Sequence, residues 1–158
     1  MRARLRILTV LLLLQLPWIA ACTAEPEPLS REFQDYWFAG KAELNRYELT
    51  QSRYGERHAG DAVLIFVTED FLPDKQVKAD SLDRSETGAV PVMKLNFTKA
   101  FNTGIYPYSV MTSSFLPLDP GDPPRVLKVT SSVQEWCGQV FSQMNLRKDG
   151  YQVRSFSY

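Results

Sequence analysis

Histidine and cysteine are scarce in this sequence, whose 158 residues include one His and two Cys. This scarcity nearly excludes a zinc site built from His and Cys ligands. The eight glycines are scattered without a GxG or GxxxxGK pattern, so the backbone cradles that bind dinucleotides and phosphates are not expected. Basic residues are not in excess, because 18 Lys and Arg face 18 Asp and Glu. Since nucleic-acid binders normally carry a basic surface, we expect no nucleic-acid partner. The scarcity of His and Cys and the scattered glycines likewise predict no metal and no cofactor.

The composition that remains is that of a folded domain. Hydrophobic residues make up 44% of the chain and charged residues 23%, which are ordinary values for a globular protein. A chain of 158 residues is long enough for one domain with a sizeable core. Wholesale disorder is therefore not expected.

The first residues have the pattern of an export signal. Arg2, Arg4 and Arg6 precede an apolar run, residues 7–16, that Thr9 and Gln15 interrupt. The run is too short to span a membrane, which takes about 20 apolar residues, and it matches the apolar segment of a secretory signal. Without the three arginines the chain has 15 basic and 18 acidic residues, so the mature protein is mildly acidic.

After the apolar run comes Ile19-Ala20-Ala21-Cys22, in which two small residues directly precede the Cys. This order resembles the lipobox of bacterial lipoproteins, in which the signal is cut before the Cys and the thiol receives a diacylglycerol. We expect residues 1–21 to be the signal peptide and Cys22 to be the lipidation site that anchors the protein to a membrane. An ordinary signal peptide in which Cys22 is incidental is the alternative. Thr23, where enterobacterial inner-membrane lipoproteins have Asp, favours the outer membrane.

Residues 22–30 are Pro-rich and acidic, with Leu29 as their one large apolar residue. Such a segment cannot bury a core, so we expect an extended tether between the lipid and the folded part. The folded part is then a β domain over residues 31–158.

The β domain is expected to begin with one short helix and to continue as strands. Phe33 and Trp37 lie one helical turn apart and follow the N-cap residue Ser30, which predicts the helix. Gly40 is expected to end it, and a strand is the alternative. Alternating or continuous apolar patterns predict the strands. They cover residues 41–54, 62–67, 92–99, 105–112, 126–133, 140–146 and 151–158.

Three of these patterns support more specific expectations. The run at 62–67 is continuously apolar, which favours a strand covered on both faces. Residues 92–99 alternate between apolar and polar, which predicts a half-buried strand. Pro107 within 105–112 predicts an edge strand or a bulged one.

The end of the chain is expected to form a hairpin. Asp149-Gly150 is a strong tight-turn signal, and residues 140–146 should pair with 151–158 around it. The buried face of this hairpin is expected to include Trp136, Val140, Met144, Tyr151 and Val153.

Strands joined in sequence by turns predict a mainly β fold with at most one short N-terminal helix. We expect a single antiparallel meander sheet, arranged as a curved sheet, a half-barrel or a sandwich. The chain stops inside the last strand pattern, so this strand either closes the sheet edge or belongs to the N-terminal part of a longer protein. In the second case Phe156 and Tyr158 would be exposed on an open edge that invites pairing with another chain.

Few residues are suited to nucleophilic catalysis. His58 is the only imidazole, and Cys137 is the only thiol left after lipidation. His58 is expected in a polar turn and Cys137 in a strand, where a free Cys is usually a small buried apolar residue. We therefore do not expect them to form a catalytic pair, and we assign no catalytic residue.

Two groups of carboxylates are candidates for acid–base chemistry or weak calcium binding. Glu69 and Asp70 follow the apolar run, and Asp119 and Asp122 flank a Pro-Gly turn. Both arrangements are common as solvated loop charges, and the spacing of a calcium-binding loop is absent. No metal site is therefore assigned.

Aromatic residues are the one excess of the composition, at 12% of the chain. Under a curved sheet they could line an apolar cavity, and the alternative is that they fill the core. The cavity candidates are Trp37, Phe66, Phe97, Tyr106, Tyr108 and Trp136.

One short motif points to a modification. Asp80-Ser81-Leu82 resembles the Asp-Ser/Thr-aliphatic acceptor of O-glycosylation in exported Bacteroidetes proteins. It lies in an expected exposed loop, which could accommodate a glycan at Ser81.

Four stretches together resemble a family of exported Bacteroidetes lipoproteins, some of which are labelled "septum formation inhibitor Maf". They are YWFAGKAE at 36–43, VTEDFLPDKQVKAD at 67–80, KLNFTKAFNTGIYPYSVMTS at 94–113 and VTSSVQEWCGQ at 129–139. The resemblance covers most of the mature chain and implies export and a lipid anchor, but no catalytic residues. The Ser-x-Arg-Arg motif of the Maf nucleotide pyrophosphatases is not present, because Tyr54 follows Ser52-Arg53.

These observations together predict a non-enzymatic lipoprotein of the cell envelope. We expect its β domain to bind an apolar or lipid-like ligand or an envelope partner protein. The alternatives are an envelope hydrolase that uses loop carboxylates and a structural surface lipoprotein without a ligand. The expected location is the outer membrane facing the periplasm, with the cell surface as the alternative.

Overall fold

The computed structural model describes residues 28–80, 88–118 and 125–157. One helix, α1, covers Arg31–Trp37, and most of the remaining described residues form strands. The strands are β1 (Glu43–Arg53), β2 (Glu56–Leu72), β3 (Val77–Lys78), β4 (Val90–Thr103), β5 (Tyr106–Pro117), β6 (Lys128–Glu135), β7 (Gly138–Arg147) and β8 (Gly150–Ser157).

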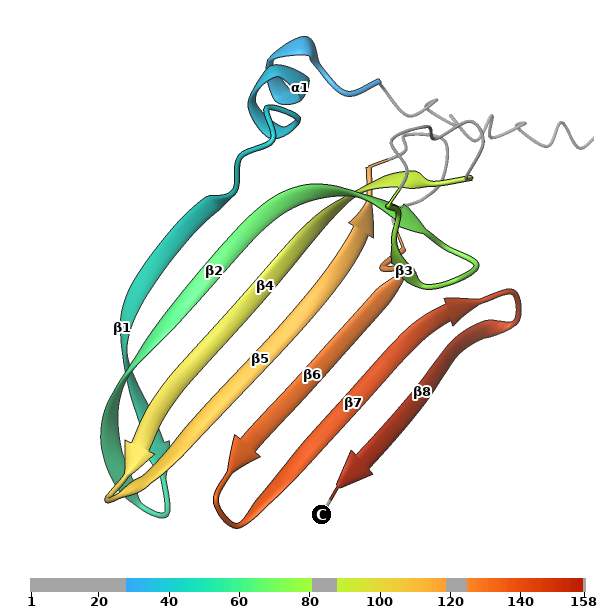
Figure 1. Cartoon of the computed structure of the whole chain (residues 1–158). Coiled ribbons are helices and arrows are strands. Elements are labelled where there is room, and N and C mark those ends of the chain that lie inside the picture. Colours follow the sequence, from blue (N-terminus) through green and yellow to red (C-terminus); the bar gives the residue numbers. More distant parts are fainter. Residues whose placement is uncertain (1–27, 81–87, 119–124, 158) are drawn as a thin grey trace, which may run out of the picture.

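The strands form one antiparallel sheet. Its order is β1-β2-β4-β5-β6-β7-β8, and β3 pairs with the upper end of β2 (Figure 1). The predicted mainly β fold with a single antiparallel meander sheet is therefore confirmed. The described residues form no second sheet, and β1 and β8 are the two edges of the sheet that they do form. The architecture is thus a curved open sheet and not a sandwich.

The sheet curls toward one of its faces. Arg53 at the end of β1 lies over Tyr108 of β5, with its guanidinium carbon 4.5 Å from the ring centroid. In a flat sheet these strands would be about 14 Å apart, because β2 and β4 lie between them. In Figure 1 the β1–β2 hairpin accordingly passes behind β4 and β5. We call the face that Arg53 and Tyr108 share the concave face and the opposite one the convex face.

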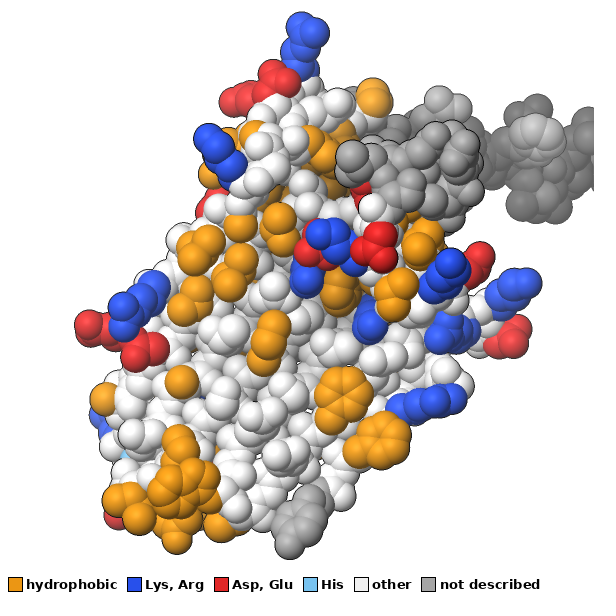
Figure 2. Space-filling view, in the orientation of Figure 1, with side chains coloured by type: hydrophobic (Ala, Val, Ile, Leu, Met, Phe, Trp, Pro, Cys, Tyr) orange, Lys and Arg blue, Asp and Glu red, His pale blue; other side chains and the backbone are white. Residues whose placement is uncertain are grey.

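The register assigns each strand residue to one of these faces, because residues directly opposite each other in antiparallel strands share a face. On the convex face a polar row crosses the sheet, in which Asn96, Ser113, Thr130 and Gln143 are successive partners. The hairpin curls away from the viewer in Figure 1, so Figure 2 shows the convex face in the same orientation. Apolar side chains form separate patches among polar ones there (Figure 2).

The buried core lies at the upper end of the sheet. It consists of Phe71, Val92, Phe115 and Leu127. The two phenylalanine rings in it are 5.0 Å apart. The Lys128 ammonium on β6 donates to the carbonyl of Gln76 at 2.8 Å and thereby holds segment 73–79 against this end. The middle of the sheet, in the part of the chain that the structure describes, is a single layer.

Helix α1 begins where the sequence predicts and ends at Trp37, with Phe38 as its C-cap, just before the predicted Gly40. The Ser30 hydroxyl accepts the Phe33 N–H at 3.1 Å, so Ser30 is the N-cap. Gly40 has a φ of +70°, a left-handed conformation that favours glycine. The Thr68 hydroxyl of β2 donates to the Trp37 carbonyl at 2.7 Å and ties the helix to the sheet. The helix is therefore confirmed, and the alternative of a strand is wrong.

Two strand predictions are wrong about their surroundings. The run at 62–67 lies inside the longer β2, and beyond Ala62 it is half-buried, because a single layer does not cover both faces. Pro107 lies on a central strand with a continuous register, neither on an edge nor in a bulge. It pairs with Asn102 of β4 near the turn, and the pairing with β6 begins only at Ser109. Its missing N–H therefore removes no bond to β6.

The C-terminal hairpin is confirmed in its pairing and corrected in its burial. Strands β7 and β8 pair around Asp149-Gly150 in a continuous antiparallel register. Met144 is half-buried, but the other residues predicted to be buried are exposed, because no layer covers this end of the described sheet. They are Trp136, Val140, Tyr151 and Val153. Phe156 is 63% exposed on the edge strand β8.

Candidate functional site

The concave face presents apolar side chains from β1 to β8. Its register rows place aliphatic and aromatic residues of neighbouring strands side by side. Those on β2 to β7 that are half-buried include Leu64, Phe66, Leu95, Phe97, Val110, Val133 and Met144. Their partial burial comes from their neighbours in the sheet and from α1, which packs on the upper end of this face.

A row of hydroxyl side chains crosses the concave face on β5 to β8. Thr112, Ser131, Ser142 and Ser155 are successive register partners. The first two hydroxyls are 3.2 Å apart and the last two 2.7 Å apart, so each pair forms one hydrogen bond. The row thus satisfies its polar groups in pairs and separates two apolar areas of the face.

Aromatic residues of α1 cover the upper end of the concave face. The Trp37 ring lies 6.4 Å from the Phe66 ring of β2 and 5.0 Å from the Tyr36 ring. Both contacts have the edge-on geometry that aromatic pairs favour. The helix therefore ends the apolar surface at this end.

A second aromatic group lies at the lower end of the face. The Phe101 and Tyr108 rings are stacked with their centroids 4.9 Å apart and their planes at 4°. Arg53 lies over the Tyr108 ring, and the His58 ring is 6.4 Å from Phe101. A hydrogen bond to the Glu135 carboxylate raises the pKa of Tyr108 above its ordinary value. This end of the face therefore combines aromatic rings with charged groups.

Five of the six predicted cavity residues fall into two separate groups. Trp37 and Phe66 belong to the upper one. The lower one contains Tyr108 and a second pair at the turns, formed by Tyr106 and the exposed Trp136 with their rings 5.2 Å apart. The sixth residue, Phe97, lies on the concave face between them, as the partner of Leu64 and Thr112 in the register. The structure thus places these aromatics on or beside one apolar face and not around a single closed space.

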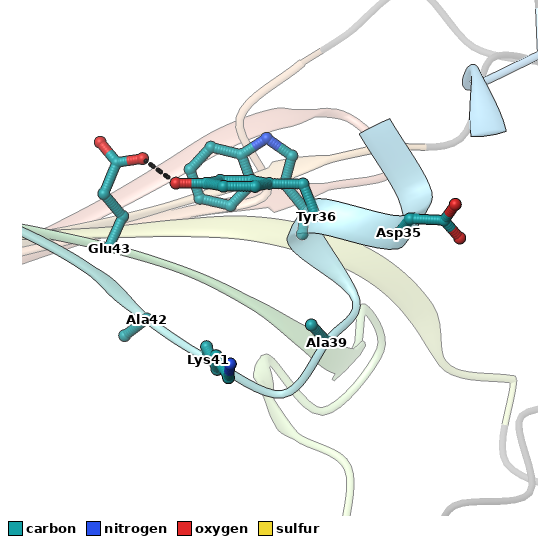
Figure 3. Close-up of a pocket in the computed structure, with 7 residues that line it drawn as sticks. Asp35, Tyr36, Ala39, Lys41, Ala42 and Glu43 are labelled. Carbon is teal, nitrogen blue, oxygen red and sulfur yellow. Dashed lines mark hydrogen bonds between the residues drawn. The ribbon is translucent and has the colours of Figure 1, made fainter. Parts of the chain in front are cut away.

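A shallow pocket of about 330 Å³ lies between α1 and the start of β1 (Figure 3). Its lining residues are Asp35, Tyr36, Trp37, Ala39, Lys41, Ala42 and Glu43. The Tyr36 hydroxyl donates to Glu43 at 3.0 Å, and this bond raises the pKa of Tyr36. Asp35 points away from this bonded pair in Figure 3. The pocket therefore does not bring its two carboxylates together for acid–base chemistry.

The two residues considered for nucleophilic catalysis are not where the sequence suggested. His58 lies within β2 and not in a turn, because the chain turns earlier, at Tyr54 and Gly55. Its Nε2 atom is buried and has no hydrogen-bond partner among the described residues. Cys137 lies in the turn between β6 and β7 and is exposed, so the prediction of a buried strand position is wrong.

The carboxylates at 69 and 70 lie within β2, not in a loop. Glu69 forms an ion pair with Lys94 of β4 at 3.0 Å on the convex face. Burial lowers the pKa of the nearby Lys128, and the charges of Arg147 and Lys94 lower it further. Glu69 is thus engaged as the counter-charge in a group of cations.

Several predicted sites lie outside the described residues. They are Cys22, Ser81, Asp119 and Asp122. In the described part of the chain, no three His, Cys, Asp or Glu side chains gather in a way that could hold a metal ion. No helix within the described ranges has the length and apolar character needed to cross a membrane.

Comparisons with family models, curated proteins and solved structures gave no match. The candidate site therefore rests on the geometry of this chain, and the concave face is the feature of the structure best suited to binding.

Two cations on the concave face were not singled out from the sequence. In the alternation of side chains along β4, Lys99 falls on the same face as Leu95 and Phe97. Along β1, Arg53 falls on the same face as Leu49. The alternation that places the apolar residues on one face therefore places these cations among them. The position of each cation in this two-residue alternation is the signal that could have identified it.

Proposed function

We propose that the chain is a lipid-anchored protein of the cell envelope whose concave face binds an apolar or lipid-like ligand. The observation that carries the proposal is the face itself. It presents apolar side chains from seven strands. Among the described residues α1 packs on its upper end and the end of β1 curls over its lower end, and the apolar rows between them are half-buried. An uncovered apolar surface is stabilised by any apolar molecule that removes it from water, by roughly 25 cal/mol per Å² buried.

The envelope location and the anchor are supported by the sequence. The basic start, the apolar run and Cys22 occur in the order of a lipoprotein signal. The acidic tether at 22–30 would hold the sheet close to a lipid surface, where apolar ligands are concentrated. Four stretches of the mature chain resemble exported Bacteroidetes lipoproteins, which agrees with this location. The outer membrane is the proposed site of anchoring.

Binding without catalysis has more support than hydrolysis. Glu69 is engaged with Lys94, and the carboxylates of the pocket beside α1 are not brought together. The apolar face instead offers area, which suits the retention of a ligand.

A neutral fluorescent probe, N-phenyl-1-naphthylamine, tests the proposal. The protein would bear Cys22→Ser, so that no attached acyl chain competes with the probe. We expect saturable binding with a blue-shifted emission. Leu95→Asn on the concave face should weaken it about tenfold, because a half-buried leucine contributes roughly 1.5–3 kcal/mol when fully covered.

The matched control is Ile65→Asn, which changes a half-buried residue of β2 on the convex face. It should leave the affinity within about twofold, as expected for a site that the residue does not touch. An absence of saturable binding, or an equal loss from both variants, would contradict the proposal.

A further inference from the structure

Lys99 is a cation near the lower end of the apolar concave face. It lies on the central strand β4, and its register partners are Ala62 of β2 and Val110 of β5. The next residues of the same face along β4 are Phe97 and Leu95. Lys99 is itself half-buried, so its ammonium lies beside apolar surface.

The ammonium of Lys99 has no ion pair among the described residues. It donates to the neutral Gln51 Oε1 at 2.9 Å and lies 5.7 Å from the centroid of the Phe101 ring. Lys94, which lies on the same strand but on the convex face, is by contrast paired with Glu69. A cation beside apolar surface with only neutral partners favours the approach of an anion, because little water screens the attraction.

Other charged groups lie at the same end of the face. Arg53 is held over Tyr108 and donates to the Tyr54 hydroxyl at 3.3 Å. Glu56 is opposite Arg53 in the register, and Glu135 accepts the hydrogen bond of Tyr108. Among the described residues neither carboxylate forms an ion pair with Lys99, which donates instead to the neutral Gln51.

We propose that Lys99 binds the anionic head group of an amphiphile, a long-chain carboxylate, whose tail lies on the concave face toward Met93. This inference rests on the proposed function and specifies the class of ligand. The seven residues from Lys99 to Met93 span about 20 Å along β4, which gives a tail room beside Phe97 and Leu95. The carboxylate head group would form an ion pair with the Lys99 ammonium, and the tail would cover the apolar side chains.

Two probes with the same tail separate the head group from the tail. Dodecanoate and dodecanol would be titrated by calorimetry into the Cys22→Ser protein. Dodecanoate should bind about tenfold more tightly, the effect expected from one hydrogen bond to a charged group. Lys99→Met should remove this preference and leave the affinity for dodecanol unchanged. Lys99→Arg, which keeps the charge, should preserve the preference.

The control is Lys148→Met, which removes the same charge from an exposed turn between β7 and β8 and should change neither affinity. If both probes bind equally and Lys99→Met has no effect, the head-group assignment is wrong while the apolar function stands. If neither probe binds, both proposals fail. Loss of dodecanol binding in a folded Lys99→Met protein would also overturn the assignment, since Lys99 would then act on the tail.

Discussion

Gly60 allows the close approach of β2 and β4 on the concave face, and its replacement by Ala should destabilise the protein. In the register Gly60 lies between Leu49 of β1 and Phe101 of β4. A Cβ at this position would meet the carbonyl oxygen of Ala100 and would lie 2.7 Å from the Phe101 Cβ. Both neighbours belong to backbone or to the first atom of a side chain, so neither can rotate away.

Whether Gly60→Ala stabilises or destabilises the protein depends on the space at this position. Where space allows, Gly→Ala stabilises a protein by about 0.4–1 kcal/mol, because it restricts the unfolded chain. Here the clash forces β2 and β4 apart, and overpacking of this kind costs about 1–3 kcal/mol. We therefore expect Gly60→Ala to lower the free energy of unfolding by about 1–2 kcal/mol, the difference between these terms.

Urea unfolding followed by tryptophan fluorescence would measure the change. Ala59→Ser is the matched control, because it adds one heavy atom at the neighbouring exposed position on the other face of β2. It should alter stability by less than about 0.5 kcal/mol, as most surface substitutions do. A Gly60→Ala protein as stable as the parent would show that the strands are not packed this closely.

Three further predictions follow from the core, the lower aromatic group and the anchor. Phe71→Ala should cost about 3–5 kcal/mol in urea unfolding, because the ring is fully buried against Phe115, and a loss near 1 kcal/mol would contradict the packing of the core. Glu135→Gln should lower the pKa of Tyr108, followed by the ultraviolet absorbance of the phenolate, and an unchanged titration would refute the hydrogen bond. The folded-state pKa of Tyr108 lies above the ordinary value of 10.0. The hydrogen bond to Glu135 therefore stabilises the folded state below pH 10.0, and this stabilisation is lost as the pH rises through the folded-state pKa. Cys22→Ala should leave the protein soluble or unprocessed on fractionation, and a mature-length protein in the outer membrane would contradict lipidation.

The sequence predicts the strands well because the alternation of side chains is a local property. Met93, Leu95 and Phe97 lie on one face as predicted, and Asp149-Gly150 forms the last hairpin turn. The turn before His58 was missed because it is made by Tyr54 and Gly55, both with positive φ, and not by one of the usual Asn-Gly or Asp-Gly pairs. Local signals therefore give the strands more readily than the position of an unusual turn.

Burial could not be predicted in the same way. Alternation shows that Val140 and Val153 share a face, but it does not show whether a second layer covers that face. Both are exposed, and so is Cys137, because the described sheet is a single layer at this end. The candidate site was likewise predicted only in part, since the sequence indicated its aromatic residues but not Lys99. The curl that brings Arg53 over Tyr108 depends on contacts between distant strands, which no short pattern contains.

The most direct test of binding on the concave face is to locate a bound ligand. A stearate that bears a nitroxide near the end of its chain would be added to protein with isotopically labelled methyl groups. We expect it to broaden the methyl resonances of Leu64, Leu95 and Val110 on the concave face at lower concentrations than those of Val63 and Ile65 on the convex face. Equal broadening on both faces, or broadening confined to Val63 and Ile65, would contradict the assignment of the concave face as the binding surface.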